Sequence, residues 1–167
     1  MILGFSTKIN NKPTCFVERI HQALRLPFFK DSVPFNSQHC NKDFDYVMFP
    51  LLRPKLHTIR EDKNDRWKSG MKIDFFINVR QKDMFRFAPV MKVVSVQDVY
   101  MSYRSNDVIQ ISVDDKELFV FSERLEFAQN DGFDTWEDFF DYFYPQIKAT
   151  PDNFLKMKLI HWTDKKY

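Results

Sequence analysis

The segment from residue 53 to residue 60 reads Arg-Pro-Lys-Leu-His-Thr-Ile-Arg and concentrates side chains that can carry protons or bind anions. Lys55 follows a proline, which favours a bend in the chain. Thr58 and Arg60 are two positions apart, so on an extended strand their side chains share one face. An amine, a hydroxyl and a guanidinium can then surround a small ligand that carries an anion or a carbonyl group. On spacing alone, the pattern is even more typical of a basic edge strand with solvated charges.

The elements that must position these side chains follow from hydrophobic periodicity. Apolar and polar residues alternate over 71–79, which predicts a strand, and the β-branched run over 89–103 predicts a long strand that bends. Apolar residues at helical spacing predict three helices. The predicted helices span 14–24, 123–129 and a segment that begins near Thr135 and is closed by Pro145; the other predicted strands are 1–5, 108–113 in a hairpin with 118–121, and 155–162.

Composition is that of an ordinary globular chain. Of its 167 residues, 44% are hydrophobic and 29% are charged, which suits one domain with its own core. The 19 phenylalanines predict a thick core between a curved sheet and covering helices. Residues 53–68 hold six Lys or Arg and three acids, whereas residues 105–142 hold eleven acids and two basic residues. A basic region beside an acidic one suits an anionic partner that is bound locally.

The cysteines give no sign of a metal site. Cys15 and Cys40 lack the spacing of metal ligands, and His39 has no obvious partner in the irregular segment 28–50. The sequence therefore predicts neither a metal nor a cofactor. It shows no signal peptide and no apolar run long enough to span a bilayer, so we expect a cytoplasmic protein with reduced thiols and no membrane partner.

Three features stand in a fixed order along the chain. The first is Lys55-x-x-Thr58-Ile-Arg60, the second is the Arg-Trp-Lys-x-Gly segment 66–70, and the third is the Asn-Asp-Gly-Phe segment 130–133 between two acidic helices. In this order the chain resembles the ASCH domain family, a relative of the PUA fold. The resemblance implies an α+β fold, a PUA-like small mixed β-barrel with external helices. It further implies a single domain over 1–167, with an N-terminal strand, helix and long excursion in 1–50 and the ASCH core in 51–162.

The resemblance also implies a cleft beside the barrel that accepts RNA or nucleotides. A small bacterial branch has amidohydrolase activity on acetylcytidine, through a lysine, a threonine and a carboxylate. These map onto Lys55, Thr58 and Asp131, where the branch has a glutamate in place of the aspartate. Members commonly carry a glycine two residues before the lysine, where this chain has Arg53. A lysine can act as base or nucleophile only if burial or a nearby cation such as Arg60 lowers its pKa, whereas an adjacent acid raises it.

Three functions follow as hypotheses. The first is RNA or nucleotide recognition, in which Arg53, Arg60, Arg66 and Lys68 contact phosphate and Trp67 stacks on a base. The second is deacylation of an acetylcytidine-type nucleoside by the three mapped residues. The third is a protein-interaction module that uses the acidic helices, which a large exposed aromatic patch would favour. The ligand's identity and the oligomeric state are left open.

Each candidate residue also has a structural explanation. An Asp before a Gly, as at Asp131, is ordinary turn chemistry. Trp67 can equally be an anchor of the core. His57 alternates away from Thr58 and is expected to face outward or to pack, while His161 is a weaker candidate for the cleft.

Overall fold

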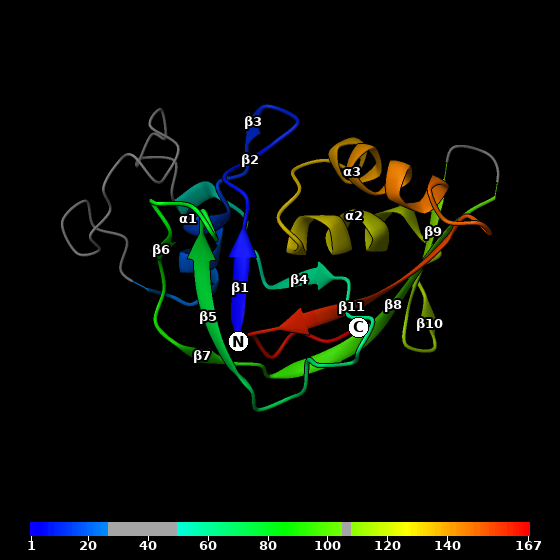
Figure 1. Ribbon diagram of the computed structural model, residues 1–167. Helices are drawn as coiled ribbons and strands as arrows, with labels where there is room; N and C mark the ends of the chain where they lie inside the picture. The colour runs from blue at the N-terminus through cyan, green and yellow to red at the C-terminus, as the bar shows by residue number, and fades with distance from the viewer. Residues whose placement is uncertain (27–49, 105–107) are drawn as a thin grey trace.

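Two larger β-sheets, a short hairpin and three helices make up the computed structural model, which describes residues 1–26, 50–104 and 108–167 (Figure 1). The predicted α+β class is confirmed. The expectations for the segment 28–50, including His39 and Cys40, lie almost wholly outside the described residues. No helix in the described part of the chain is both long and apolar enough to cross a membrane.

The four-stranded sheet is built on the strand that the alternating pattern predicts. β5 (Lys72–Ile77) buries every second residue, as expected for a strand with one face on the core. It pairs in parallel with β1 (Ile2–Phe5). β6 (Phe85–Arg86) and β7 (Met91–Lys92) are short antiparallel partners of the same strand.

The five-stranded sheet has the order β10-β9-β8-β11-β4, and all its pairings are antiparallel. The long strands β8 (Ser95–Tyr103) and β11 (Phe154–His161) lie in its interior, and β4, His57–Arg60, is an edge strand that pairs with β11. The remaining strands are β9 (Ile109–Val113) and β10 (Lys116–Glu117).

The predicted hairpin after β9 forms, but its second strand is Lys116–Glu117 and not 118–121. Leu118 is instead buried in the core, where its N–H donates to Ile111 O at 2.9 Å. The turn is therefore tighter than the sequence predicts.

A bent segment joins the two larger sheets. β7 pairs with β5 of the first sheet, and β8 pairs with β11 of the second. Between them, Val93 N–H donates to Met71 O and Val94 N–H donates to His161 O, both at 2.8 Å. The strand predicted over 89–103 thus bends from one sheet into the other. The strands of the described residues do not close into the barrel that the resemblance implies.

The N-terminal part adds a hairpin and a helix beside the four-stranded sheet. β2 (Lys8–Ile9) and β3 (Lys12–Pro13) pair only with each other in the described structure. The hairpin projects from the end of β1 (Figure 1). α1 (Phe16–Ala23) follows it, within the limits predicted from the helical pattern.

α2 (Phe121–Asn130) begins two residues earlier than the predicted start at residue 123. The carboxylate of Glu123 accepts a hydrogen bond from Val120 N–H at 3.2 Å. This contact satisfies a backbone donor that has no partner inside the helix. Side-chain capping by Glu123 therefore sets the start of the helix.

α3 (Trp136–Lys148) begins near Thr135, as predicted, and the Thr135 hydroxyl caps it by accepting a hydrogen bond from Asp138 N–H at 3.1 Å. The expectation that Pro145 closes this helix is wrong, because the helix continues to Lys148. Proline removes one backbone hydrogen bond inside a helix. Packing offsets that loss here, since Ile147 is fully buried beyond the proline.

Two apolar cores lie on either side of β11. Leu159 belongs to the first core, which α2 and α3 form with one face of the five-stranded sheet. The next residue, Ile160, belongs to the second core, between the four-stranded sheet and α1. Successive residues of a strand point to opposite faces, so one strand can serve both cores. The edge strand β4 lies beside β11 at this junction.

Candidate functional site

Lys55 lies immediately before β4, in a segment that is held between α1 and the end of α2. Its N–H donates to Arg19 O at 3.1 Å, and Leu56 N–H donates to Asn130 O at 2.8 Å. With the backbone fixed on both sides, the Lys55 side chain turns inward and is only 1% exposed. A lysine is almost never buried to this extent without a partner.

Asp131 is that partner. It caps the C-terminus of α2, and its Oδ1 accepts from Lys55 Nζ at 3.0 Å and from the backbone N–H of Ile59 at 3.1 Å. Lys55 Nζ also donates to the main-chain oxygen of Asp131. β4 is an edge strand, so its outer N–H groups have no neighbouring strand. One carboxylate oxygen of Asp131 therefore accepts hydrogen bonds from both the edge of β4 and the buried ammonium.

Four predicted site residues meet at one cavity. Lys55, Thr58, Arg60 and Asp131 all line a cavity of about 40 Å³. Thr58 and Arg60 share one face of β4, as their spacing predicts, and the rest of the wall is mainly apolar. A cavity of this size has room for water-sized molecules and not for a nucleobase.

Burial controls the charges in this cavity. Desolvation lowers the pKa of Lys55 to about 8, although the carboxylate of Asp131 opposes the change. The sequence-based requirement for a lowered lysine pKa is therefore met mainly by burial, with Arg60 and Arg19 as smaller contributions. Burial of Asp131 would raise its pKa, but the charge of Lys55 and the nearby His57 hold that pKa below its usual range.

Arg60 is held in place by the neighbouring sheet. Its guanidinium donates to Gly4 O at 2.5 Å and lies over the Phe5 ring, with Cζ 5.2 Å from the ring centroid. Burial lowers the pKa of this group, which nevertheless stays charged at neutral pH because an arginine pKa is so high. The side chain can present positive charge to the cavity without moving.

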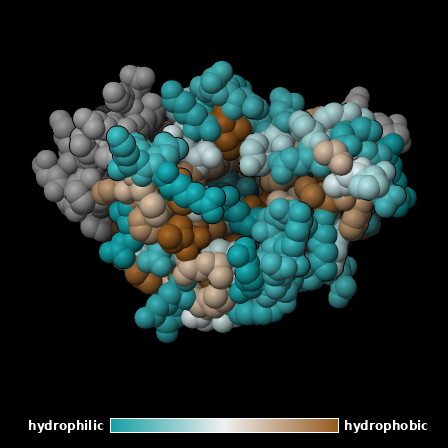
Figure 2. Space-filling view, in the orientation of Figure 1, coloured by the Kyte–Doolittle hydropathy of each residue, from teal (hydrophilic) through white to brown (hydrophobic). Residues whose placement is uncertain are grey.

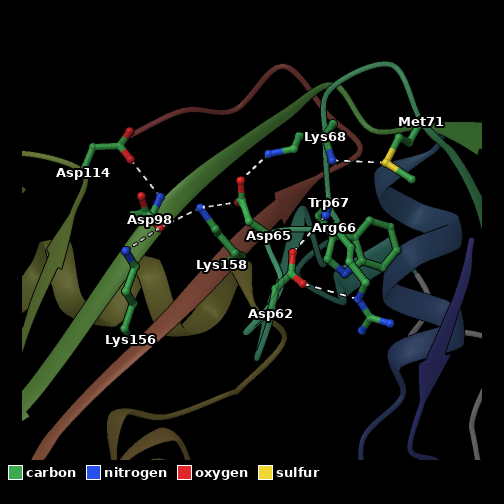
Figure 3. Close-up of polar contacts among 10 residues, drawn as sticks. All are labelled: Asp62, Asp65, Arg66, Trp67, Lys68, Met71, Asp98, Asp114, Lys156 and Lys158. Atoms are coloured by element: carbon green, nitrogen blue, oxygen red, sulfur yellow. Dashed lines mark hydrogen bonds and ion pairs between the residues drawn. The ribbon is translucent and has the colours of Figure 1, made fainter.

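The other predicted anion-binding residues lie outside this cavity. Arg66 and Lys68 are on the turn between β4 and β5, where each faces an aspartate, Asp62 at 3.6 Å and Asp65 (Figure 3). Trp67 on the same turn is 5% exposed and packs in the second core, so its ring cannot stack on a base from there. Its role is the packing one that the sequence also allowed.

Arg53 is exposed, and its guanidinium donates to the side chain of Gln129 on α2. It also lies outside the set of residues that line the inner cavity. Four basic residues were assigned to phosphate binding, and all four lie in the described part of the chain. Of these four, Arg60 is the one that lines the inner cavity.

His57 is the site residue that the sequence reasoning missed. Its ring is fully buried, with Nδ1 at 3.5 Å from Asp131 Oδ1 and Nε2 at 2.8 Å from the hydroxyl of Tyr167. Alternation along β4 places His57 on the same side as Ile59, whose side chain packs in the first core against α2. That signal was present, but the end of α2 was not known to cover this edge.

Comparisons with models of protein families, with curated proteins and with solved structures found no match to this chain. Within the described ranges, no group of three His, Cys, Asp or Glu side chains could hold a metal ion. The arrangement offers acid–base chemistry by a buried amine and a carboxylate.

The glycine after Asp131 gives a first prediction. Gly132 has φ +95°, and a Cβ there would meet Phe16 Cε1 at 2.7 Å and Lys55 Cδ at 3.1 Å. Gly70 has a similar φ of +83° with nothing within 4 Å, so it is a matched control. We expect Gly70→Ala to lower the free energy of unfolding by about 1 kcal/mol through backbone strain. Gly132→Ala should cost about 1–3 kcal/mol more because of the overlap. Urea unfolding measures both, and equal losses would contradict the tight approach at Gly132.

Proposed function

We propose that this chain is an amidohydrolase that removes the acyl group from a small acylated nucleoside of the acetylcytidine type. The observation that carries the proposal is the Lys55 amine, buried against Asp131 on a cavity that it shares with Thr58. A lysine with its pKa lowered to about 8 has a substantial neutral fraction near physiological pH. The resemblance to the ASCH family supplies the class of substrate.

The residues suggest the following reaction. Neutral Lys55 accepts a proton from water, and the hydroxide adds to the acyl carbonyl carbon. The Thr58 hydroxyl orients the water or donates to the oxyanion. Asp131 stabilises the ammonium that forms on Lys55, in the way that a carboxylate stabilises the imidazolium of a catalytic triad. Collapse of the tetrahedral intermediate breaks the C–N bond, and the leaving amine takes the proton back from Lys55.

A second cavity lies next to this site. It measures about 180 Å³ and shares Ile9, Phe16 and Phe133 with the inner cavity. This face of the molecule is hollowed near its centre, below the β2–β3 hairpin (Figure 2). We place the nucleoside in the outer cavity, with its acyl group directed inward past Ile9. The hairpin is tied to α3 at this opening by the ion pair of Lys12 and Asp138, at 2.9 Å.

The proposal includes a PUA-like arrangement of the two sheets. It is supported by the segment 89–103, which bends from one sheet into the other, and by the ligand cavity beside the edge strand β4. A PUA-like fold with an incomplete barrel is consistent with both features. The PUA-like fold is one specific type within the α+β class.

The second candidate function is RNA or nucleotide binding. It is favoured by one observation, that Arg60 and Lys55 bring two cations to the cavity against the single carboxylate of Asp131. It is disfavoured by the rim of the outer cavity, which has three aspartates and one lysine. The third candidate, protein interaction, is supported by the exposed residues Phe119, Val120 and Phe121 at the start of α2.

Substitution of the lysine separates an enzyme from a binder. Lys55→Arg keeps a positive charge but cannot supply a neutral base, because guanidinium stays protonated. We expect this variant to release no acetate from acetylcytidine while its affinity for the nucleoside changes by no more than a few fold. Asp131→Asn should lose most of the turnover, and Lys166→Arg on the surface is the matched control. Turnover that survives Lys55→Arg would remove the lysine mechanism.

The pKa of Lys55 also predicts a pH dependence. Protonated Lys55 cannot accept a proton from water, so the active form is the neutral amine. We expect kcat/KM to rise about tenfold per pH unit at low pH and to level off above about 8, the pKa of Lys55. Initial rates of acetate release between pH 5.5 and 9.5 give this profile. A rate that is flat through this range would show that Lys55 is not the base.

Binding to RNA or nucleotides has a different signature. Contacts to phosphate release bound counterions, so affinity that depends on such contacts falls steeply as the salt concentration rises. We expect Arg60→Ala to weaken such binding more than Lys166→Ala, since Arg60 lines the cavity and Lys166 lies on the surface. A salt titration with both variants, with circular dichroism to confirm folding, tests this candidate. Affinity independent of salt, or equal losses in both variants, would count against it.

A further inference from the structure

His57 lies behind Asp131, on the side of β4 that faces α2. Its ring is fully buried and packs on Phe127, with the ring centroids 5.5 Å apart. Nδ1 makes no hydrogen bond of good geometry among the described residues, yet it lies 3.5 Å from Asp131 Oδ1. A buried polar nitrogen aimed at a buried carboxylate calls for an explanation.

The hydrogen bonds on the other side of the ring favour one tautomer. The side-chain amide of Asn130 donates to the Tyr167 hydroxyl oxygen at 2.8 Å. That hydroxyl has one proton to donate, and His57 Nε2 lies 2.8 Å away as its acceptor. The proton of the neutral ring is then on Nδ1, the nitrogen that faces Asp131. Tyr167 and Asn130 therefore set the orientation of the donor.

The groups around His57 keep it neutral. Burial lowers its pKa, Asp131 opposes this change, and Lys55 and Lys165 add to it. The ring of His161 on β11 also faces it, with the ring centroids 5.2 Å apart, and burial lowers the pKa of His161 to about 3. Burial also raises the pKa of Tyr167 well above its usual value. At neutral pH, Asp131, Lys165 and the protonated fraction of Lys55 are the charged groups that act on the ring.

We propose that His57 is a positioning residue, which donates from Nδ1 to Asp131 Oδ1 and so keeps the carboxylate charged and oriented when Lys55 is neutral. The contacts of this carboxylate in the described structure all end on Oδ1: Lys55 Nζ, Ile59 N–H and His57 Nδ1. The proposal rests on the proposed function in one respect, that neutral Lys55 begins the reaction.

The need for such a donor follows from the low polarity of the site. When Lys55 loses its proton, Asp131 loses the ammonium that it contacts directly and keeps only the charge of Arg60 across the cavity, and burial favours its protonation. A protonated Asp131 could not stabilise the ammonium that forms on Lys55 in the reaction. Hydrogen bonds to the charged form lower a carboxyl pKa, so the donor on His57 opposes that loss.

Two substitutions separate the two nitrogens of the ring. The amide nitrogen of His57→Asn reaches the position of Nδ1, whereas that of His57→Gln reaches the position of Nε2. We expect His57→Gln to raise the pKa of Asp131 by about one unit or more, and His57→Asn to retain a low pKa. Carbon-13 NMR of labelled aspartate carboxyl groups measures this pKa, with Asp131→Asn to identify the signal. The measurement needs no substrate, so its result is separate from the outcome for acetate release.

Nitrogen-15 NMR of the unmodified protein gives a test that does not depend on a variant folding. We expect His57 to be a neutral ring with its proton on Nδ1 at pH 7. If the chain also releases acetate, His57→Gln should reduce kcat more than His57→Asn does. A proton found on Nε2 in the unmodified protein overturns the proposal, and so does an Asp131 pKa that is unchanged in His57→Gln. The proposed function fails separately, if no acetate is released while the His57 results hold.

Discussion

The contact between the Lys55 ammonium and the Asp131 carboxylate is the constraint around which this structure is arranged. Both groups are almost completely removed from water, where each alone would be strongly unfavourable. A buried ion pair stabilises little by itself, but removing one partner leaves an uncompensated charge that costs about 3–5 kcal/mol. The surrounding elements must therefore hold the two groups together in any folded state of the chain.

That requirement links parts of the chain that are 76 residues apart. Lys55 is supplied by the segment before the edge strand β4, and Asp131 by the end of α2. The edge of β4 is open to α2 because β11 occupies its other side. Asp131 then serves three purposes at once, since it ends the helix, satisfies the strand edge and pairs with the lysine. Architecture and candidate chemistry depend on the same carboxylate.

Enclosure decides which chemistry the site favours. The inner cavity admits small groups, and the wider cavity next to it lies under the β2–β3 hairpin. Desolvation lowers the lysine pKa in such a place, whereas the same lysine on an open basic surface would stay protonated. The basic turn with Arg66 and Lys68 is such an open surface, and its charges are already balanced by aspartates. An enclosed cavity with a buried lysine thus lies along β4, and a solvated basic turn follows the end of the strand.

The sequence by itself determined the local elements and the outline of the site. Alternation predicted β5 and the shared face of Thr58 and Arg60, and the helical stripes predicted α1 and α3, because side-chain direction repeats with the backbone period. Local pattern also selected Lys55 as a candidate, whereas Asp131 was a candidate through the resemblance to the ASCH family. It misjudged the helix end at Pro145, where packing of a distant core outweighs a local rule.

Only the tertiary structure decided what these residues can do. Burial of Trp67, the approach of Asp131 to β4 and the position of His57 between Asp131 and Tyr167 all depend on segments far apart in sequence. The two sheets meet through a bend without closing, which periodicity does not report. A proton's position depends on solvent exclusion and on the partners within a few ångströms. Those are properties of the folded chain, and no local sequence pattern contains them.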